Sequence, residues 1–159
     1  MIVFKEIDDD LIKSAITEKI LRQLPEWFGL EASILEYIQN VKKKLFFAVY
    51  DGEMAVGFIC ISYHNVFTAE LYLTGILKKY HRKGIGKELV AIAEKKLVEK
   101  GFIMFMVKTL GESVDCEEYN RTRYFYRSVG FYPLEEFTQI WDEENPCLIM
   151  AKSLNNNFA

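Results

Sequence analysis

Three consecutive elements in the middle of the chain constrain the fold more than any other feature. An apolar segment at Ala69–Leu77 leads through a glycine-containing turn to a helical pattern at Gly86–Lys100 and a second apolar segment at Ile103–Leu110. Apolar residues in the middle part recur at three-and-four spacing, which indicates an amphipathic helix. Two strands joined by a crossover helix lie parallel in one sheet. We therefore expect a βαβ unit at the centre of the fold.

Further strands and helices are predicted on both sides of this unit. Strands are expected at Met1–Ile7, Leu45–Tyr50, Met54–Tyr63, Phe131–Phe137 and Pro146–Lys152, and helices at Asp8–Leu24, Glu31–Lys43 and Tyr119–Val129. The first helix is expected to bury Leu11, Ile12, Ala15, Ile16, Ile20 and Leu24. The element order predicts an α/β (α+β) fold: a single mixed, mostly antiparallel sheet of six to seven strands with a central parallel βαβ unit and helices on both faces.

The composition is that of an ordinary globular protein. We expect one domain at 1–152 and a disordered tail at 153–159, because no linker or repeat divides the 159 residues. The net charge of -3 argues against nucleic acid as a partner, and no apolar run reaches the length that a membrane span requires. Three cysteines, Cys60, Cys116 and Cys147, match no paired metal spacing. With a charged start, they favour a reduced, cytoplasmic setting.

The turn between the central strand and helix has the features of a phosphate site. Gly84 and Gly86 allow a sharp bend and a close approach to the backbone. The first amides of the helix have no partners within it and lie at the positive end of its dipole. Five cationic residues crowd the same stretch: Lys78, Lys79, Arg82, Lys83 and Lys87. A dinucleotide fingerprint is excluded by Leu89, and a phosphate loop is excluded because Glu88 follows Lys87.

Two segments resemble the signatures of the GNAT superfamily. His81-Arg82-Lys83-Gly84-Ile85-Gly86 is similar to its acyl-coenzyme A signature, which is Arg or Gln, two residues, Gly, one residue, then Gly or Ala. The family prefers Arg or Gln where this chain has His81, so His81 or Arg82 takes that role. Phe125–Phe131 resembles the later signature, a tyrosine four residues before Gly-Phe. The family often has Asn seven residues before that tyrosine; here the Asn is one step later, at Asn120.

The resemblance implies transfer of an acetyl group from acetyl-CoA, with no metal, to a primary amine of a small molecule or peptide by direct attack. Cofactor contacts are then expected at Ile76, Leu77, His81, Arg82, Lys83, Gly84, Ile85, Gly86, Lys87 and Asn120. Tyr126 would protonate the departing thiolate, because a free tyrosine keeps its proton at neutral pH. A backbone amide near Ile76 would stabilise the oxyanion.

The base and the acceptor pocket are less specified. The family often uses a carboxylate at the position of Glu70, and Glu112, Asp115 and Glu117 are rivals for this role; His64 is interpreted as a turn residue. Trp27 and Phe28 either wall the acceptor pocket or anchor the early helices to the core. The alternative function is a non-catalytic acyl-CoA-binding sensor or regulatory module, and a third is a plain scaffold. A homodimer is compatible with the sequence, which does not define the oligomeric state.

Overall fold

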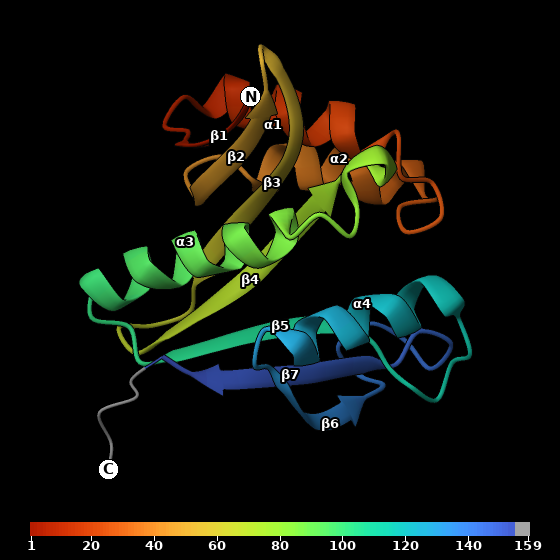
Figure 1. Ribbon diagram of the computed structural model, residues 1–159. Coiled ribbons are helices and arrows are strands. Elements are labelled where there is room, and N and C mark those ends of the chain that lie inside the picture. Colours follow the sequence, from red (N-terminus) through yellow and green to blue (C-terminus); the bar gives the residue numbers. More distant parts are fainter. Residues whose placement is uncertain (155–159) are drawn as a thin grey trace. The chain divides into compact units, whose positions relative to one another are not determined.

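The structure, a computed structural model, describes residues 1–154 (Figure 1). In this part of the chain seven strands form one sheet in the order β1-β2-β3-β4-β5-β7-β6. Strand β4 (Thr68–Ile76) is parallel to β5 (Met104–Leu110). The β1–β2, β2–β3, β5–β7 and β6–β7 pairs are antiparallel. The predicted fold class is therefore confirmed, including the central parallel pair.

Contacts divide the chain into two compact units. Unit 1 contains Met1–Ser62 and Tyr72–Lys96, and unit 2 contains Tyr63–Leu71 and the chain from Leu97 onward. Strand β4 and helix α3 (Ile85–Glu99) each contribute residues to both units. A single domain at 1–152 stays a prediction. Of the predicted tail at 153–159, Ser153 ends a strand, and 155–159 lie outside the described residues.

Unit 1 holds the first half of the chain and most of α3. Its elements in chain order are β1 (Ile2–Glu6), α1 (Asp10–Leu21), α2 (Glu31–Asn40), β2 (Leu45–Asp51), β3 (Met54–Tyr63), the end of β4, the 3₁₀ turn η1 (Lys78–Tyr80) and α3. In Figure 1, α3 lies in front of β4, and α1 and α2 lie behind β2 and β3. The stacked rings of Phe46 and Phe58 form part of the buried core, with centroids 5.1 Å apart.

The buried face of α1 differs from the prediction. Leu11, Ile12 and Ala15 are exposed, Leu11 to 74%, whereas Lys13, Ser14 and Thr17 are buried. Each buried polar side chain has a carbonyl partner. Lys13 Nζ donates to the Lys44 carbonyl at 2.6 Å, Ser14 Oγ donates to the Ile38 carbonyl at 2.7 Å, and Thr17 Oγ1 donates to the Lys13 carbonyl at 2.8 Å. Periodicity alone missed this face because buried polar groups are tolerated once they are hydrogen-bonded.

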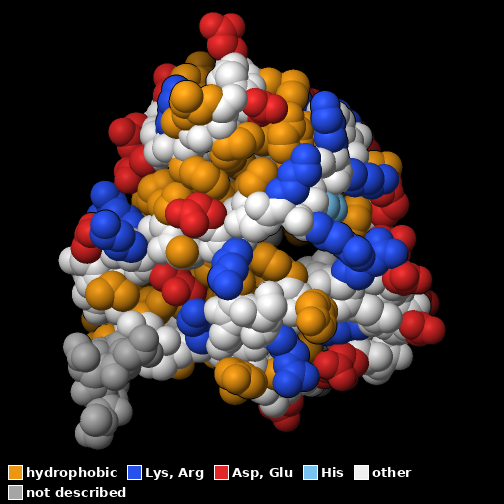
Figure 2. Space-filling view, in the orientation of Figure 1, with side chains coloured by type: hydrophobic (Ala, Val, Ile, Leu, Met, Phe, Trp, Pro, Cys, Tyr) orange, Lys and Arg blue, Asp and Glu red, His pale blue; other side chains and the backbone are white. Residues whose placement is uncertain are grey.

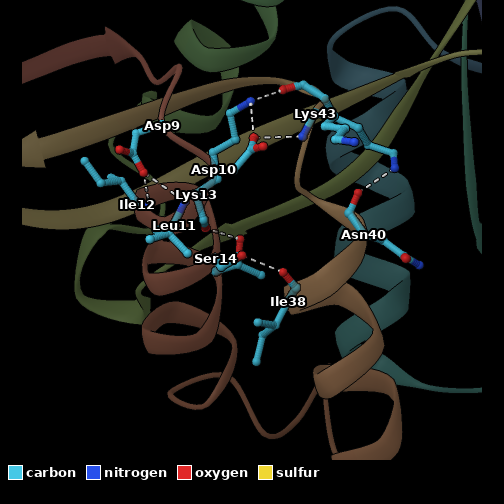
Figure 3. Close-up of polar contacts among 11 residues, drawn as sticks. Asp9, Asp10, Leu11, Ile12, Lys13, Ser14, Ile38, Asn40 and Lys43 are labelled. Atoms are coloured by element: carbon cyan, nitrogen blue, oxygen red, sulfur yellow. Dashed lines mark hydrogen bonds and ion pairs between the residues drawn. The ribbon is translucent and has the colours of Figure 1, made fainter.

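The start of α1 is capped by Asp9 (Figure 3). Asp9 Oδ1 accepts hydrogen bonds from the Leu11 and Ile12 amides at 2.9 and 3.1 Å. Next along the chain, Asp10 Oδ1 accepts from the Lys43 amide at 2.8 Å, a bond that lowers the pKa of Asp10. The second contact ties the helix start to the turn between α2 and β2, where Lys43 has a left-handed φ of 63°.

Unit 2 is built on β5, β7 (Cys147–Ser153) and β6 (Tyr132–Phe137), with α4 (Glu117–Ser128). The parallel pairing aligns Thr68–Leu71 with Met104–Val107. Phe105 packs against Phe131, just beyond α4, at a centroid distance of 5.2 Å. Since side chains alternate along a strand, Met106 and Lys108 point to the opposite face from Phe105.

Boundaries predicted from the sequence agree with the structure to within a few residues. The 3₁₀ turn at Lys78–Tyr80 was not predicted, because three residues are too short for a periodic signal. None of the helices within residues 1–154 is long and apolar enough to cross a membrane.

Candidate active site

The glycine turn is the part of unit 1 that presents backbone amides to a ligand. Arg82 and Gly84 both have left-handed backbones, with φ of 60° and 78°, and the chain reverses sharply before α3. The Gly84 carbonyl accepts from the Glu88 amide at 3.0 Å, which makes Gly84 the residue that caps the helix. A Cβ at Gly84 would meet no protein atom within 4 Å. Within residues 1–154, no protein atom therefore blocks the approach of a ligand to Gly84, the residue before the first amides of α3.

His81 ties this turn back to β4. Its ring Nε2 lies 2.6 Å from the Ile76 carbonyl oxygen, within hydrogen-bond distance. The indole of Trp27 approaches the His81 ring edge-on, with centroids 5.9 Å apart. Nearby, Lys78 and Glu26 form an ion pair. His81 thus joins the turn to both β4 and the connection after α1.

Cationic side chains surround the turn. Lys78, Lys79, Arg82, Lys83 and Lys87 are all exposed. Figure 2 shows Lys and Arg side chains gathered near this end of α3. Lys83 Nζ also lies 5.6 Å from the centroid of the Tyr80 ring, whose hydroxyl donates to Asp51 at 2.6 Å. Open backbone amides beside several cations suit a polyphosphate such as that of coenzyme A.

Ile76 is the last residue of β4, and Leu77, predicted to end the strand, follows it and precedes η1. The Leu77 amide donates to the Val56 carbonyl of β3 at 2.9 Å. Successive amides of a strand point to opposite edges, so the Ile76 amide is directed to the other edge of β4. The role of the Ile76 amide as an oxyanion donor stays a prediction.

Trp27 and Phe28 are half-buried in the connection between α1 and α2. Phe28 is part of a series of edge-on rings with Tyr37 of α2 and Tyr72 of β4, at centroid distances of 6.0 and 5.9 Å. Asn40 donates to the Tyr72 hydroxyl at 3.0 Å. Both residues therefore help to hold their connection in place, and their role toward an acceptor stays a prediction.

Glu70, the predicted base, is a buried carboxylate in unit 2. Only 7% of its side chain is exposed, so it is not a solvated surface acid. His64 Nε2 lies 2.6 Å from Glu70 Oε1, and Lys108 Nζ lies 3.5 Å from the same oxygen. The rivals Glu112, Asp115 and Glu117 are exposed, and Glu117 pairs with Arg121 at 2.9 Å.

The contact of His64 and Lys108 with Glu70 was missed at the level of sequence. His64 does lie in a turn, in the connection between β3 and β4, as interpreted. A signal was available, because a histidine six residues before an acid across a hairpin connection can face it as a diagonal neighbour. Lys108 gives no such local signal, since its position depends on the parallel pairing of β4 with β5.

Tyr126 lies on the buried side of α4. It contacts the rings of Phe125 and Phe131 at centroid distances of 5.7 and 5.8 Å. The Phe131 amide donates to the Tyr126 carbonyl at 3.0 Å, which closes the helix at the Gly-Phe of the later signature. The motif therefore has a packing role, and the predicted acid role of the phenol stays a prediction.

Asn120 is already used within α4. Its Oδ1 accepts a hydrogen bond from the buried Arg123, whose guanidinium also donates to the Leu110 carbonyl. This arrangement fixes the start of α4 against the end of β5. No group of three or more His, Cys, Asp or Glu residues that could hold a metal ion occurs among the described residues.

Cys60 and Cys147 are not placed to act as nucleophiles. Burial raises the pKa of the Cys60 thiol to about 12 and also raises that of Cys147. A raised thiol pKa means less thiolate, and thiolate is the nucleophile. These two cysteines therefore behave as core residues.

A mixed sheet with one parallel pair, and a phosphate-suited turn directly after the first strand of that pair, are the features expected from the resemblance to coenzyme A-dependent acyltransferases. The sequence matches the model of the acetyltransferase (GNAT) family over residues 13–131. The chain therefore belongs to this family, and it is an acyl-CoA-dependent acetyltransferase.

Relatives agree with this assignment. An uncharacterised N-acetyltransferase of Chlorobaculum tepidum is 29% identical over 125 residues, which are 77% of this chain and 72% of that protein. The structure of a protein described as a GNAT-family acetyltransferase from Desulfovibrio desulfuricans has a TM-score of 0.83 at 14% identity, covering 98% of this chain and all of the other. An aminoglycoside 6'-N-acetyltransferase complexed with coenzyme A has a TM-score of 0.75 at 19% identity, covering 98% of each chain.

Proposed function

We propose that this protein transfers an acetyl group from acetyl-CoA to the primary amine of a small molecule or a peptide. The observation that carries the proposal is the turn at Arg82–Gly84, whose left-handed backbone opens the first amides of α3 amid exposed cations. Such a site suits the pyrophosphate of coenzyme A. The solved structure of an aminoglycoside acetyltransferase with coenzyme A supports the same cosubstrate.

The chemistry assigns one proton transfer to each of two side chains. Glu70 takes a proton from the ammonium form of the acceptor through water, and leaves a neutral amine. The amine nitrogen attacks the thioester carbonyl, and the Ile76 amide stabilises the negative charge that develops on the carbonyl oxygen. The carbon–sulfur bond then breaks, and Tyr126 donates its phenolic proton to the thiolate.

Burial of Glu70 supports its role as a base. A carboxylate with 7% exposure is shielded from bulk water, and His64 and Lys108 hold it in place. The rivals Glu112, Asp115 and Glu117 are exposed and are not shielded in this way. A cationic amine is a natural partner for a buried carboxylate.

A direct test combines binding with turnover. Acetyl-CoA is expected to raise the melting temperature, because ligand at 100 times its dissociation constant adds about 2.7 kcal/mol of stability. A library of primary amines, including aminoglycosides and peptides with free amino groups, is then screened for thiol release. Transfer to at least one amine supports the enzyme.

The same two measurements distinguish the enzyme from a non-catalytic acyl-CoA sensor and from a plain scaffold. Tight binding of acetyl-CoA with no thiol release across the library would favour the sensor or regulatory module. No change in melting temperature at millimolar acetyl-CoA would contradict both the enzyme and the sensor.

A further inference from the structure

His64 is held in a fixed position next to Glu70. The His64 amide donates to the Thr68 carbonyl at 3.0 Å, so the two residues face each other across the connection between β3 and β4. Asn65 Oδ1 accepts from the Phe67 and Thr68 amides at 2.8 and 2.9 Å and closes the turn between them. Glu70 is two residues beyond Thr68 on the same face of β4, which makes it the diagonal neighbour of His64.

The buried side chain of Glu70 has two polar partners. An ionised carboxylate is costly to bury without partners. Two groups that can donate to it, His64 from the β3–β4 connection and Lys108 from β5, both contact Oε1. The third titratable neighbour is Cys147 of β7, whose pKa is raised by burial and, to a smaller extent, by Glu70 itself, while Lys108 lowers it. Cys147 therefore stays neutral beside the carboxylate.

The two partners of Glu70 differ in geometry. The His64 contact of 2.6 Å is short for a nitrogen–oxygen hydrogen bond, whereas the Lys108 contact of 3.5 Å is a long one. The imidazole is a rigid ring, and the backbone of His64 is held by its hydrogen bond to Thr68. The His64 side chain is 41% exposed. His64 is thus the group that defines the direction of the carboxylate.

We propose that His64 is a positioning residue for the base: its Nε2–H donates to Oε1 of Glu70 and so directs the other oxygen, Oε2, to the water that relays the proton of the acceptor amine. This role deepens the proposed function and rests on it. His64 itself gains and loses no proton in this step. The proton that leaves the acceptor ammonium is taken by Glu70 alone.

The test measures His64→Ala, His64→Gln, Glu70→Gln and the double variant His64→Ala/Glu70→Gln, with an amine found in the thiol-release screen. Glu99→Gln, which changes an exposed acid at the end of α3, is the control for loss of a carboxylate. The kcat, the KM of the amine and the Kd of acetyl-CoA are determined for each.

We expect His64→Ala to lower kcat about 10- to 100-fold, the loss typical of removing one hydrogen bond to a charged group. The Kd of acetyl-CoA should not change. His64→Gln should recover most of the rate, because its side-chain amide can donate to the same oxygen. The double variant should be no slower than Glu70→Gln, because a positioning residue has no effect once its base is gone.

Several results would overturn the proposal. They are an unchanged kcat in His64→Ala, a His64→Gln variant as slow as His64→Ala, or losses that multiply in the double variant. If His64→Ala does not fold, His64→Leu replaces it, since leucine has similar bulk and no donor. Wild-type turnover with an unaffected Glu70→Gln would refute this proposal and the base assignment but leave the acetyltransferase intact. No turnover by the wild type with any amine would refute the proposed function as well.

Discussion

The His81 ring contacts the Ile76 carbonyl across 2.6 Å and so joins the turn before α3 to the end of β4. This histidine occupies the position where the family prefers Arg or Gln. Its Nε2 is used for the backbone of its own unit. The residue therefore shapes the turn that would receive the cofactor, whatever further contact its ring makes.

Replacing His81 tests whether its contact with the Ile76 carbonyl supports acetyl-CoA binding. His81→Ala should weaken acetyl-CoA binding by about 2- to 12-fold, the range expected for one intramolecular hydrogen bond. His81→Gln should bind like the wild type, because its side-chain amide can donate to the Ile76 carbonyl. Isothermal titration calorimetry measures both. Equal binding by His81→Ala and the wild type would show that the contact does not support the site.

Gly84 is predicted to matter for binding more than for stability. Gly84→Leu should lose measurable affinity for acetyl-CoA, because the new side chain occupies the open approach to the first amides of α3. Gly52→Leu is the matched control: Gly52 also has a left-handed φ, of 63°, and open space around it, but it lies in the β2–β3 hairpin. Each variant should lose about 1–2 kcal/mol of unfolding free energy from backbone strain. Unchanged affinity in Gly84→Leu would mean that the turn is not a phosphate site.

The phenol of Tyr126 is predicted to act in turnover. Tyr126→Phe keeps the ring that packs on Phe131 and should lower kcat roughly 10²- to 10⁴-fold, the usual contribution of a general acid. The Kd of acetyl-CoA should stay the same. Tyr124→Phe, on the same helix but 77% exposed, is the control and should have wild-type kinetics. A wild-type rate in Tyr126→Phe would show that the hydroxyl has no role in turnover and that the ring only packs.

Asp9 is predicted to stabilise the fold through the cap of α1. Asp9→Ala removes the acceptor of two amides and should lower the unfolding free energy by about 1 kcal/mol. Asp8→Ala, which removes an exposed neighbouring acid, serves as the control. Urea denaturation followed by circular dichroism measures the difference. Similar losses in both variants would mean that general charge effects, and not the cap, account for the change.

Stability is predicted to fall at alkaline pH because of Cys60. Burial raises the pKa of this thiol from 9.0 to about 12, so between these values the unfolded chain loses a proton that the folded chain keeps. The stabilisation is complete below about pH 9 and is lost as the pH rises toward 12. Cys60→Ala should show a shallower decline in unfolding free energy between about pH 8 and 10.5 than the wild type. Cys116→Ala, at a half-exposed position, is the control. Parallel curves for Cys60→Ala and the wild type would contradict the assignment.

Local pattern was sufficient for the central elements. The apolar run at Ala69–Leu77, the glycines at 84 and 86 and the periodic helix after them predicted the βαβ unit, because each property is encoded within a few neighbouring residues. The phosphate-suited turn followed from the same stretch, since glycine conformations and helix amides are local.

Contacts between distant segments decided the rest. Lys13 and Ser14 turned inward because the carbonyls of Lys44 and Ile38 accept their hydrogen bonds, and α1 alone contains no trace of those partners. The family resemblance points to Glu70, but its local sequence does not predict that it is buried. It becomes a buried carboxylate because the turn places His64 beside it and the parallel pairing brings Lys108 to the same oxygen. Burial and charge environment depend on which segments meet in space, and periodicity along a single segment does not contain that information.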